Sequence, residues 1–175
     1  MKSKSRAFSV IELLVVLFIT FSIATALVTN YRKGTRDNNL RTGSQEIVSV
    51  LRRAQSGVIS GLQYNNATVA NLRVSFDKSS NTSYQMCAES DYCAANVLEQ
   101  VALPENTYLD DLIIEGQGVL NRADAIFSAP FADISFKTDN VSSETAKILT
   151  IVLKNYDGGE AKVKIDPISG KIEVE

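Results

Sequence analysis

The sequence contains no histidine and no tryptophan, and among its 175 residues only three are proline and two are cysteine. Without histidine, neither a Ser-His-Asp or Cys-His catalytic centre nor a histidine-ligated zinc site can be built. No Walker phosphate loop, dinucleotide fingerprint or metal motif is present either. We therefore expect no enzyme activity and no cofactor. The net charge of -2 and the pI of about 5.3 also argue against a general nucleic-acid binder.

The two cysteines, Cys87 and Cys93, are separated by five residues. A zinc site needs about four ligands, and carboxylates would have to supply the other two, which makes a poor ligand set for a soft metal. A disulfide is the better interpretation if this part of the chain is exported, because exported domains meet an oxidising environment. Two unpaired thiols are the alternative.

Charge is nearly absent from a long stretch close to the N-terminus. Residues 8–28 (FSVIELLVVLFITFSIATALV) contain a single charged side chain, Glu12. As a helix they would be about 31 Å long, at about 1.5 Å per residue, and a bilayer core is about 30 Å thick. Residues 1–7 (MKSKSRA) carry three cations and no acid. This pattern predicts one membrane crossing, with the N-terminus in the cytoplasm and the rest of the chain outside.

Three interpretations of the apolar stretch compete. A secretory signal would be shorter and would end at a small-x-small site, for which Ala24-Thr25-Ala26 is the candidate. A plain signal anchor has no use for an acid so early in its apolar run, since a carboxylate at mid-bilayer costs roughly 2.5–3.5 kcal/mol. The third interpretation takes the lone acid, Glu12, as a functional residue.

The segment R-A-F-S-V-I-E-L-L-V-V-L resembles the class III signal of type IV prepilins and pseudopilins. The resemblance implies that residues 1–7 are a leader peptide, and that a prepilin peptidase cuts between Ala7 and Phe8 and methylates the new amine of Phe8. Ala7 stands where the family usually has glycine, and alanine is a tolerated variant there. Glu12 is then the fifth mature residue, and the resemblance implies that it pairs with the Phe8 amine of a neighbouring subunit during filament assembly.

Residues 29–61 are expected to form an extramembrane amphipathic helix, with either a weak point or a hinge at Gly34 and an end near Gly57 or Gly61. Its apolar residues recur at spacings of seven, four, three and four: Leu40, Ile47, Leu51, Ala54 and Val58. The stretch L-R-R-A-Q-S-G-V-I-S-G is similar to the one that follows the anchor in H-type minor pseudopilins and FimT-like minor pilins.

Residues 62–175 are expected to form a β-rich head, because short alternating runs replace the helical period and turn residues separate them. Val163/Ile165 and Ile172/Val174 alternate on either side of a Pro-Ile-Ser-Gly turn and predict a closing hairpin. A long helix followed by antiparallel strands is an α+β pattern, with the apolar helix face covering one side of a sheet. The resemblance implies a pilin-like fold. Further strands are expected at 71–77, 83–89, 97–103, 109–115, 125–127, 133–136 and 148–153.

Two further patterns are candidate ligand sites. Asp110-Asp111 and Glu173/Glu175 suggest a calcium site, but no dense D-x-D-x-D-G pattern accompanies them, and a solvated surface is the better interpretation. Gly116-x-Gly118 is more typical of a strand end than of a phosphate loop.

The function expected from the resemblance is that of a structural subunit of a type II secretion pseudopilus or a type IV pilus. Its partners would be other pilin subunits, the prepilin peptidase, the inner-membrane assembly platform and the lipid bilayer. The alternative is a DNA-binding minor pilin of a natural-transformation apparatus, with Arg52, Arg53 and Arg73 as the contact patch. Loss of the leader lowers the count of basic residues from 18 to 15, against 20 acidic residues, which disfavours this alternative.

Overall fold

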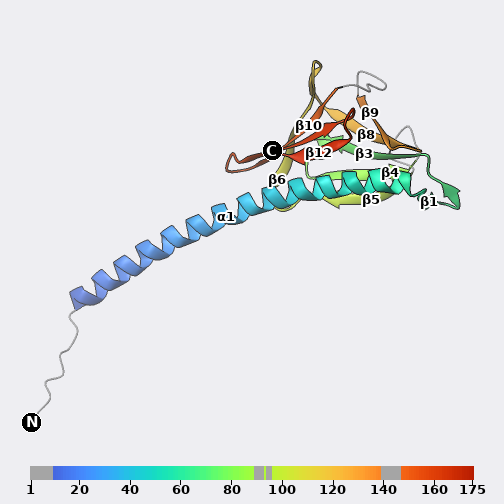
Figure 1. Ribbon diagram of the computed structural model, residues 1–175. Coiled ribbons are helices and arrows are strands. Elements are labelled where there is room, and N and C mark those ends of the chain that lie inside the picture. The colour runs from blue at the N-terminus through green and yellow to red at the C-terminus, as the bar shows by residue number, and fades with distance from the viewer. Residues whose placement is uncertain (1–9, 89–92, 94–95, 139–146) are drawn as a thin grey trace, which may run out of the picture. The chain divides into compact units, whose positions relative to one another are not determined.

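The computed structural model describes residues 10–88, 93, 96–138 and 147–175. The chain divides into two compact units, one ending at Thr35 and the other running from Arg36 to Glu175. A single α-helix, α1 (Val10–Ile59), supplies all the described residues of the first unit and the first element of the second. Figure 1 shows this helix and the strands that follow it. The expected α+β fold class is confirmed.

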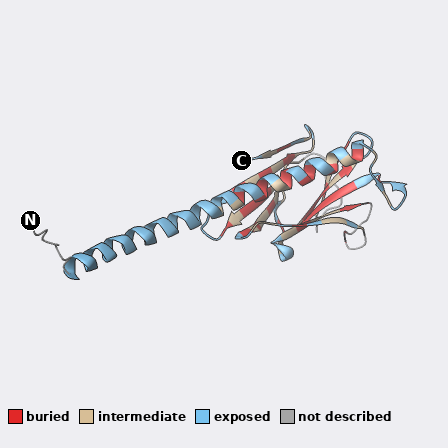
Figure 2. Ribbon diagram, turned by 90° about the horizontal axis from the view of Figure 1, so that it is seen from below, coloured by how far each residue is buried: buried red, intermediate tan, exposed pale blue. Residues whose placement is uncertain are grey.

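The described residues of the first unit, 10–35, are helical, and their side chains are exposed (pale blue in Figure 2). The segment is long and apolar enough to cross a membrane. Its hydroxyl groups bond to the helix itself. Thr20 Oγ1 donates to the Val16 carbonyl at 3.0 Å and Thr25 Oγ1 to the Phe21 carbonyl at 2.9 Å. These bonds satisfy polar groups that would otherwise be costly in hydrocarbon.

The helix is continuous through Gly34, which is one of the two alternatives for this position. It ends at Ile59, close to the expected end. Gly61 adopts a left-handed conformation with φ of 69°. The Gly61 N–H donates to the Val58 carbonyl, and the Leu62 N–H donates to the Gly57 carbonyl at 3.0 Å. This is a Schellman motif, in which glycine takes the left-handed position at no steric cost.

The head contains two five-stranded antiparallel sheets rather than the single sheet that the sequence led us to expect. In spatial order, the first sheet consists of β5 (Val97–Ala102), β4 (Ser83–Ala88), β3 (Asn71–Asp77), β8 (Arg122–Ser128) and β9 (Asp133–Thr138). The second sheet consists of β12 (Lys171–Val174), β11 (Glu160–Asp166), β10 (Leu149–Asn155), β6 (Thr107–Ile114) and β7 (Gly118–Leu120). The remaining elements are a short hairpin of β1 (Gln63–Tyr64) and β2 (Ala67–Thr68), and a 3-10 helix, η1 (Lys78–Ser80).

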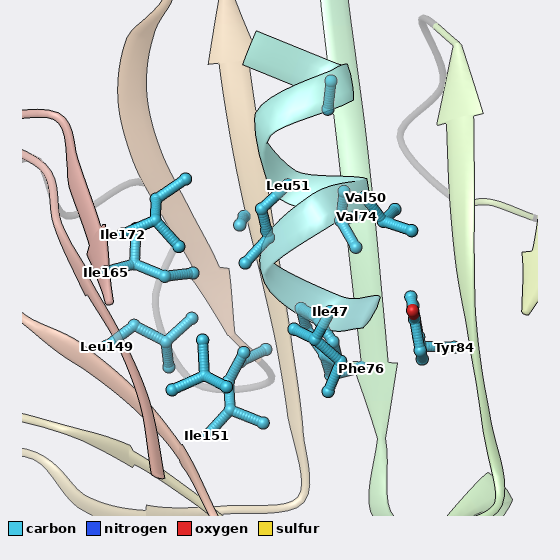
Figure 3. Packing of buried hydrophobic residues seen from close by; sticks show 14 of the residues in the cluster. Ile47, Val50, Leu51, Val74, Phe76, Tyr84, Leu149, Ile151, Ile165 and Ile172 are labelled. Atoms are coloured by element: carbon cyan, nitrogen blue, oxygen red, sulfur yellow. The ribbon is translucent and has the colours of Figure 1, made fainter. Parts of the chain in front are cut away.

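From Arg36 onward, α1 packs one face against both sheets. Figure 3 shows the helix between side chains of the second sheet, among them Ile165, and side chains of the first, among them Val74 and Phe76. Leu51 and Ile47 are fully buried at this junction. Burying an aliphatic side chain of this size contributes roughly 1.5–3 kcal/mol. The buried helix face comprises Leu40, Gly43, Ser44, Ile47, Val48, Val50, Leu51, Ala54 and Val58.

The close packing of α1 depends on a small residue at position 57. A Cβ atom built on Gly57 would lie 2.9 Å from Cδ1 of Leu72, which is itself buried in β3. Nothing larger fits unless Leu72 moves. Gly57 therefore marks a helix–sheet contact, and the helix end expected at Gly57 or Gly61 belongs to Gly61.

The turn between β10 and β11 is fastened to the helix by a buried asparagine. Asn155 is 1% exposed, and its Oδ1 accepts from the Gly159 N–H at 2.7 Å and the Asp157 N–H at 3.1 Å. Its Nδ2 donates to Asp37 Oδ1 at 3.2 Å, and an ion pair between Arg36 and Asp157 lies beside it. These contacts tie a turn to a helix residue more than one hundred positions earlier.

We expect Asn155→Ala to lower the free energy of unfolding by about 1–3 kcal/mol, because two backbone N–H groups of the turn lose the buried Asn155 side chain as their acceptor. Urea unfolding of the full chain in detergent micelles, followed by far-ultraviolet circular dichroism, measures the change. Asn39→Ala is the matched control. Asn39 makes one exposed hydrogen bond, to the Glu105 carbonyl at 3.1 Å. An Asn155 variant no less stable than this control would contradict the assignment.

Candidate functional site

Glu12 lies in the first turn of α1, with its side chain exposed among exposed apolar neighbours such as Ile11 and Leu13. The sequence has no lysine or arginine between positions 10 and 31. A carboxylate in such surroundings requires a cationic or hydrogen-bonding partner once water is removed. The partner must therefore come from outside this stretch, either from the chain's own N-terminus or from another molecule.

Ala7 and Phe8, the residues predicted to flank the cleavage site, lie outside the described residues. Their predicted roles stay predictions. What the structure adds is that the helix is already formed at Val10, two residues after Phe8.

Cys87 and Cys93 form a disulfide with a Cα–Cα distance of 5.4 Å. Both residues are buried, Cys87 near the end of β4 and Cys93 in the connection to β5. A disulfide of this kind is typical of a domain that lies outside the cytoplasm. It also removes both thiols from any role as metal ligands.

The three arginines proposed as a DNA-contact patch do not form one. Arg73 is only 8% exposed, and its Nη1 donates to Asp124 Oδ2 at 3.1 Å. Arg53 pairs with Glu99 of β5 at 3.1 Å, whereas Arg52 Nη2 donates to the Ile172 carbonyl of β12 at 3.3 Å. Because Arg73 is buried and already neutralised, it cannot meet a phosphate, and the patch is wrong at this position.

The prediction that Arg73 contacts DNA failed because the sequence does not show which residues cover the second face of its strand. Arg73 and Ser75 alternate with Leu72, Val74 and Phe76, so they point away from the helix. On β8, Asp124 is also buried, at 3% exposure. Its Oδ1 accepts from Ser75 Oγ at 2.6 Å and from Arg122 Nε at 3.3 Å. No local signal in the sequence links these residues, which lie about fifty positions apart.

The acidic residues considered for calcium are paired with lysines. Asp110 Oδ2 lies 2.6 Å from Lys154 Nζ, and Asp111 Oδ1 lies 2.8 Å from Lys78 Nζ. Glu173 and Glu175 pair with Lys171 and Lys164, respectively. Across the described residues, no group of three or more histidine, cysteine, aspartate or glutamate side chains could hold a metal ion.

Gly116 and Gly118 lie at the turn between β6 and β7, with φ of 82° and 85°. Gly118 pairs with Ile114 across this hairpin. The strand-end interpretation of this pair is therefore correct, and the positive φ values explain why glycine stands at both positions.

No protein-family model, no curated protein and no solved structure matches the chain. What the structure itself provides is the architecture, a long N-terminal helix with an apolar first half, packed through its second half on antiparallel sheets. That architecture is consistent with the pilin-like one. The pilin-specific features remain predictions from residues 7–12 of the sequence.

Proposed function

We propose that the chain is a minor pilin or pseudopilin, a structural subunit of a type II secretion pseudopilus or a type IV pilus. It would be processed and N-methylated at Phe8 by a prepilin peptidase. The observation that carries this proposal is Glu12, a lone carboxylate on an exposed apolar helix that continues without a break into the head. An ordinary membrane anchor has no need of this acid, whereas a subunit that pairs it with a neighbour's N-terminus does.

Before assembly, the subunit would lie in the inner membrane as a single-pass protein, with its N-terminus in the cytoplasm and its disulfide-bonded head outside. The assembly platform would then extract it into the filament. Lateral packing of the apolar helix segments of neighbouring subunits would replace contacts with lipid. Within a bundle of such helices, the carboxylate of Glu12 and the amine of Phe8 would both be withdrawn from water, so each would need the other.

The DNA-binding alternative loses support, because Arg73 is buried against Asp124 and Arg53 is paired with Glu99. Neither can neutralise a phosphate without giving up its carboxylate.

Sequencing of the mature N-terminus tests the proposal. We expect the protein recovered from cells to begin at Phe8 and to carry one methyl group on its α-amine, detected by mass spectrometry of the N-terminal peptide. The matched control is the same chain expressed without the prepilin peptidase, which should retain residues 1–7. If the peptidase-positive cells also yield a chain with residues 1–7, or one that begins after Ala26, the proposal is wrong.

A further inference from the structure

A groove runs between α1 and strand β12 on the head. It consists of two adjoining hollows of about 500 and 400 Å³, both of which are lined by Val174. Leu40 and Val48 of the helix and Ile172 and Val174 of the strand provide its apolar lining. We call this surface the edge groove. From Asp37 to Ser56 the helix extends about 28 Å at about 1.5 Å per residue, which matches an extended peptide of about eight residues.

The strand that forms one wall of the edge groove has an open hydrogen-bonding edge. β12 lies at the end of the second sheet, and within the described part of the chain its one partner strand is β11. Lys162 and Glu175 exchange both backbone hydrogen bonds, at 2.8 and 3.1 Å. In an antiparallel ladder the bonded pairs alternate, so the N–H and C=O groups of Ile172 and Val174 point away from β11.

An open edge of this kind is a template for another strand. Among the described residues, the contact recorded at this edge is a single bond, from Arg52 Nη2 to the Ile172 carbonyl at 3.3 Å. The arginine reaches the edge from the helix, at a distance near the long end of a hydrogen bond. The N–H and C=O groups of Val174 point away from β11, and Val174 lines both hollows of the groove.

The charges of the edge groove favour an acidic ligand. Three acids on the strand side of the lining are each paired with a lysine: Glu160 with Lys162 at 2.8 Å, Glu173 with Lys171 at 2.6 Å and Glu175 with Lys164 at 2.7 Å. On the helix side, Arg41 and Arg52 line the groove, and neither has a carboxylate within 4.0 Å among the described residues. Asp37 is the remaining acid in the lining, and it accepts a hydrogen bond from Asn155. Among the described lining residues, the charged side chains without an ion-pair partner are Arg41, Arg52 and Asp37, so the net unpaired charge of the groove is +1.

We propose that the edge groove binds an extended acidic peptide segment of a partner protein, which adds to β12 as a further strand. Its backbone would bond to Val174, its alternate apolar side chains would contact Leu40, Val48 and Val174, and its acidic side chains would meet Arg41 and Arg52. A nucleic acid fits less well, because a phosphodiester chain has no row of N–H donors for the strand edge. This proposal does not depend on the assignment as a filament subunit.

The test uses the full chain in detergent micelles and a fluorescein-labelled nonapeptide of alternating valine and glutamate. We expect fluorescence anisotropy to show saturable binding, with slowed hydrogen–deuterium exchange at the Val174 amide. The same peptide with lysine in place of glutamate should bind at least tenfold more weakly. An equally charged single-stranded oligonucleotide should also bind more weakly, and empty micelles serve as the blank. Equal binding of the lysine peptide, tighter binding of the oligonucleotide, or unchanged exchange at Val174 would each overturn the proposal.

Matched variants separate the groove from the rest of the surface. We expect Arg41→Gln and Arg52→Gln each to weaken binding roughly two- to fivefold, which is the usual size of one exposed charge pair. Arg32→Gln, on the part of the helix outside the groove, should leave binding unchanged. Val174→Pro removes an N–H that β11 does not use, so the head should keep its circular dichroism spectrum while losing peptide binding. If the Val174 variant is folded and binds like the parent chain, or if all three arginine variants behave alike, the proposal is wrong.

Discussion

A chain carrying Glu12→Leu is expected to be cut before Phe8 to nearly the same extent as the parent chain and yet to enter filaments at least tenfold less. Glu12 is exposed on the apolar segment of α1, and the sequence has no lysine or arginine between positions 10 and 31 to pair with it. If the N-terminal amine of a neighbour is its partner, leucine leaves that amine buried without a counter-charge. A buried, uncompensated charge costs several kcal/mol, which is ample for a tenfold loss at about 1.4 kcal/mol per decade.

Immunoblots of sheared filaments measure how much of the variant is incorporated. Immunoblots of membranes show, from the size of the protein, whether it has been cleaved. Glu105→Leu is the matched control, because Glu105 is an exposed glutamate of the head. It should be both processed and incorporated normally. Normal incorporation of the Glu12 variant would remove the role assigned to this carboxylate, whereas loss of cleavage would show that Glu12 acts earlier, in recognition by the peptidase.

The second large effect is expected in the head, where Asp124→Ala should lower the free energy of unfolding by about 3–5 kcal/mol. The carboxylate is 3% exposed and accepts hydrogen bonds from Arg73, Ser75 and Arg122. Alanine removes the acceptor that these three side chains share on the first sheet. Arg73, itself buried, loses the carboxylate at 3.1 Å that offsets its charge. Urea unfolding of the full chain in micelles measures the loss.

Asp110→Ala provides the matched comparison for this prediction. Asp110 also pairs with a cation, Lys154 at 2.6 Å, but both side chains are partly exposed, at 26% and 34%. Exposed pairs contribute about 0–1 kcal/mol, because water screens them and the side chains lose entropy. We therefore expect Asp110→Ala to change stability by less than about 1 kcal/mol. If both variants lost the same free energy of unfolding, burial would not be the reason that Asp124 contributes to stability.

Most strands of the head could be predicted from the sequence because their signal is local. The run 71–77 alternates as NLRVSFD, and β3 has these bounds. The closing hairpin predicted from Val163/Ile165 and Ile172/Val174 is also confirmed, with Ile165 opposite Ile172. The strands that were missed, β1, β2 and β7, have only two or three residues. A period of two cannot be recognised in segments so short.

The division of the strands into two sheets could not be predicted. β6 is separated from β10 by more than thirty residues, yet it pairs with β10 in the second sheet, while β8 and β9, which lie between them in sequence, belong to the first. The alternation of apolar and polar residues shows which side chains of a strand share a face, but it does not show which other strand pairs with that strand. The choice of neighbour is made by long-range packing, here by a helix whose buried face contacts both sheets.

By itself, the sequence determined the apolar helix with its single acid, the α+β class and most strand positions, because each follows from the order of neighbouring residues. Only the tertiary structure decided that Arg73 is buried against Asp124, that Asn155 ties a turn to the helix, and that Arg41 and Arg52 flank an open strand edge. Those facts depend on which distant segments meet. The sequence identifies each charged side chain, but only the folded structure shows whether that side chain is buried, paired or free to bind a ligand.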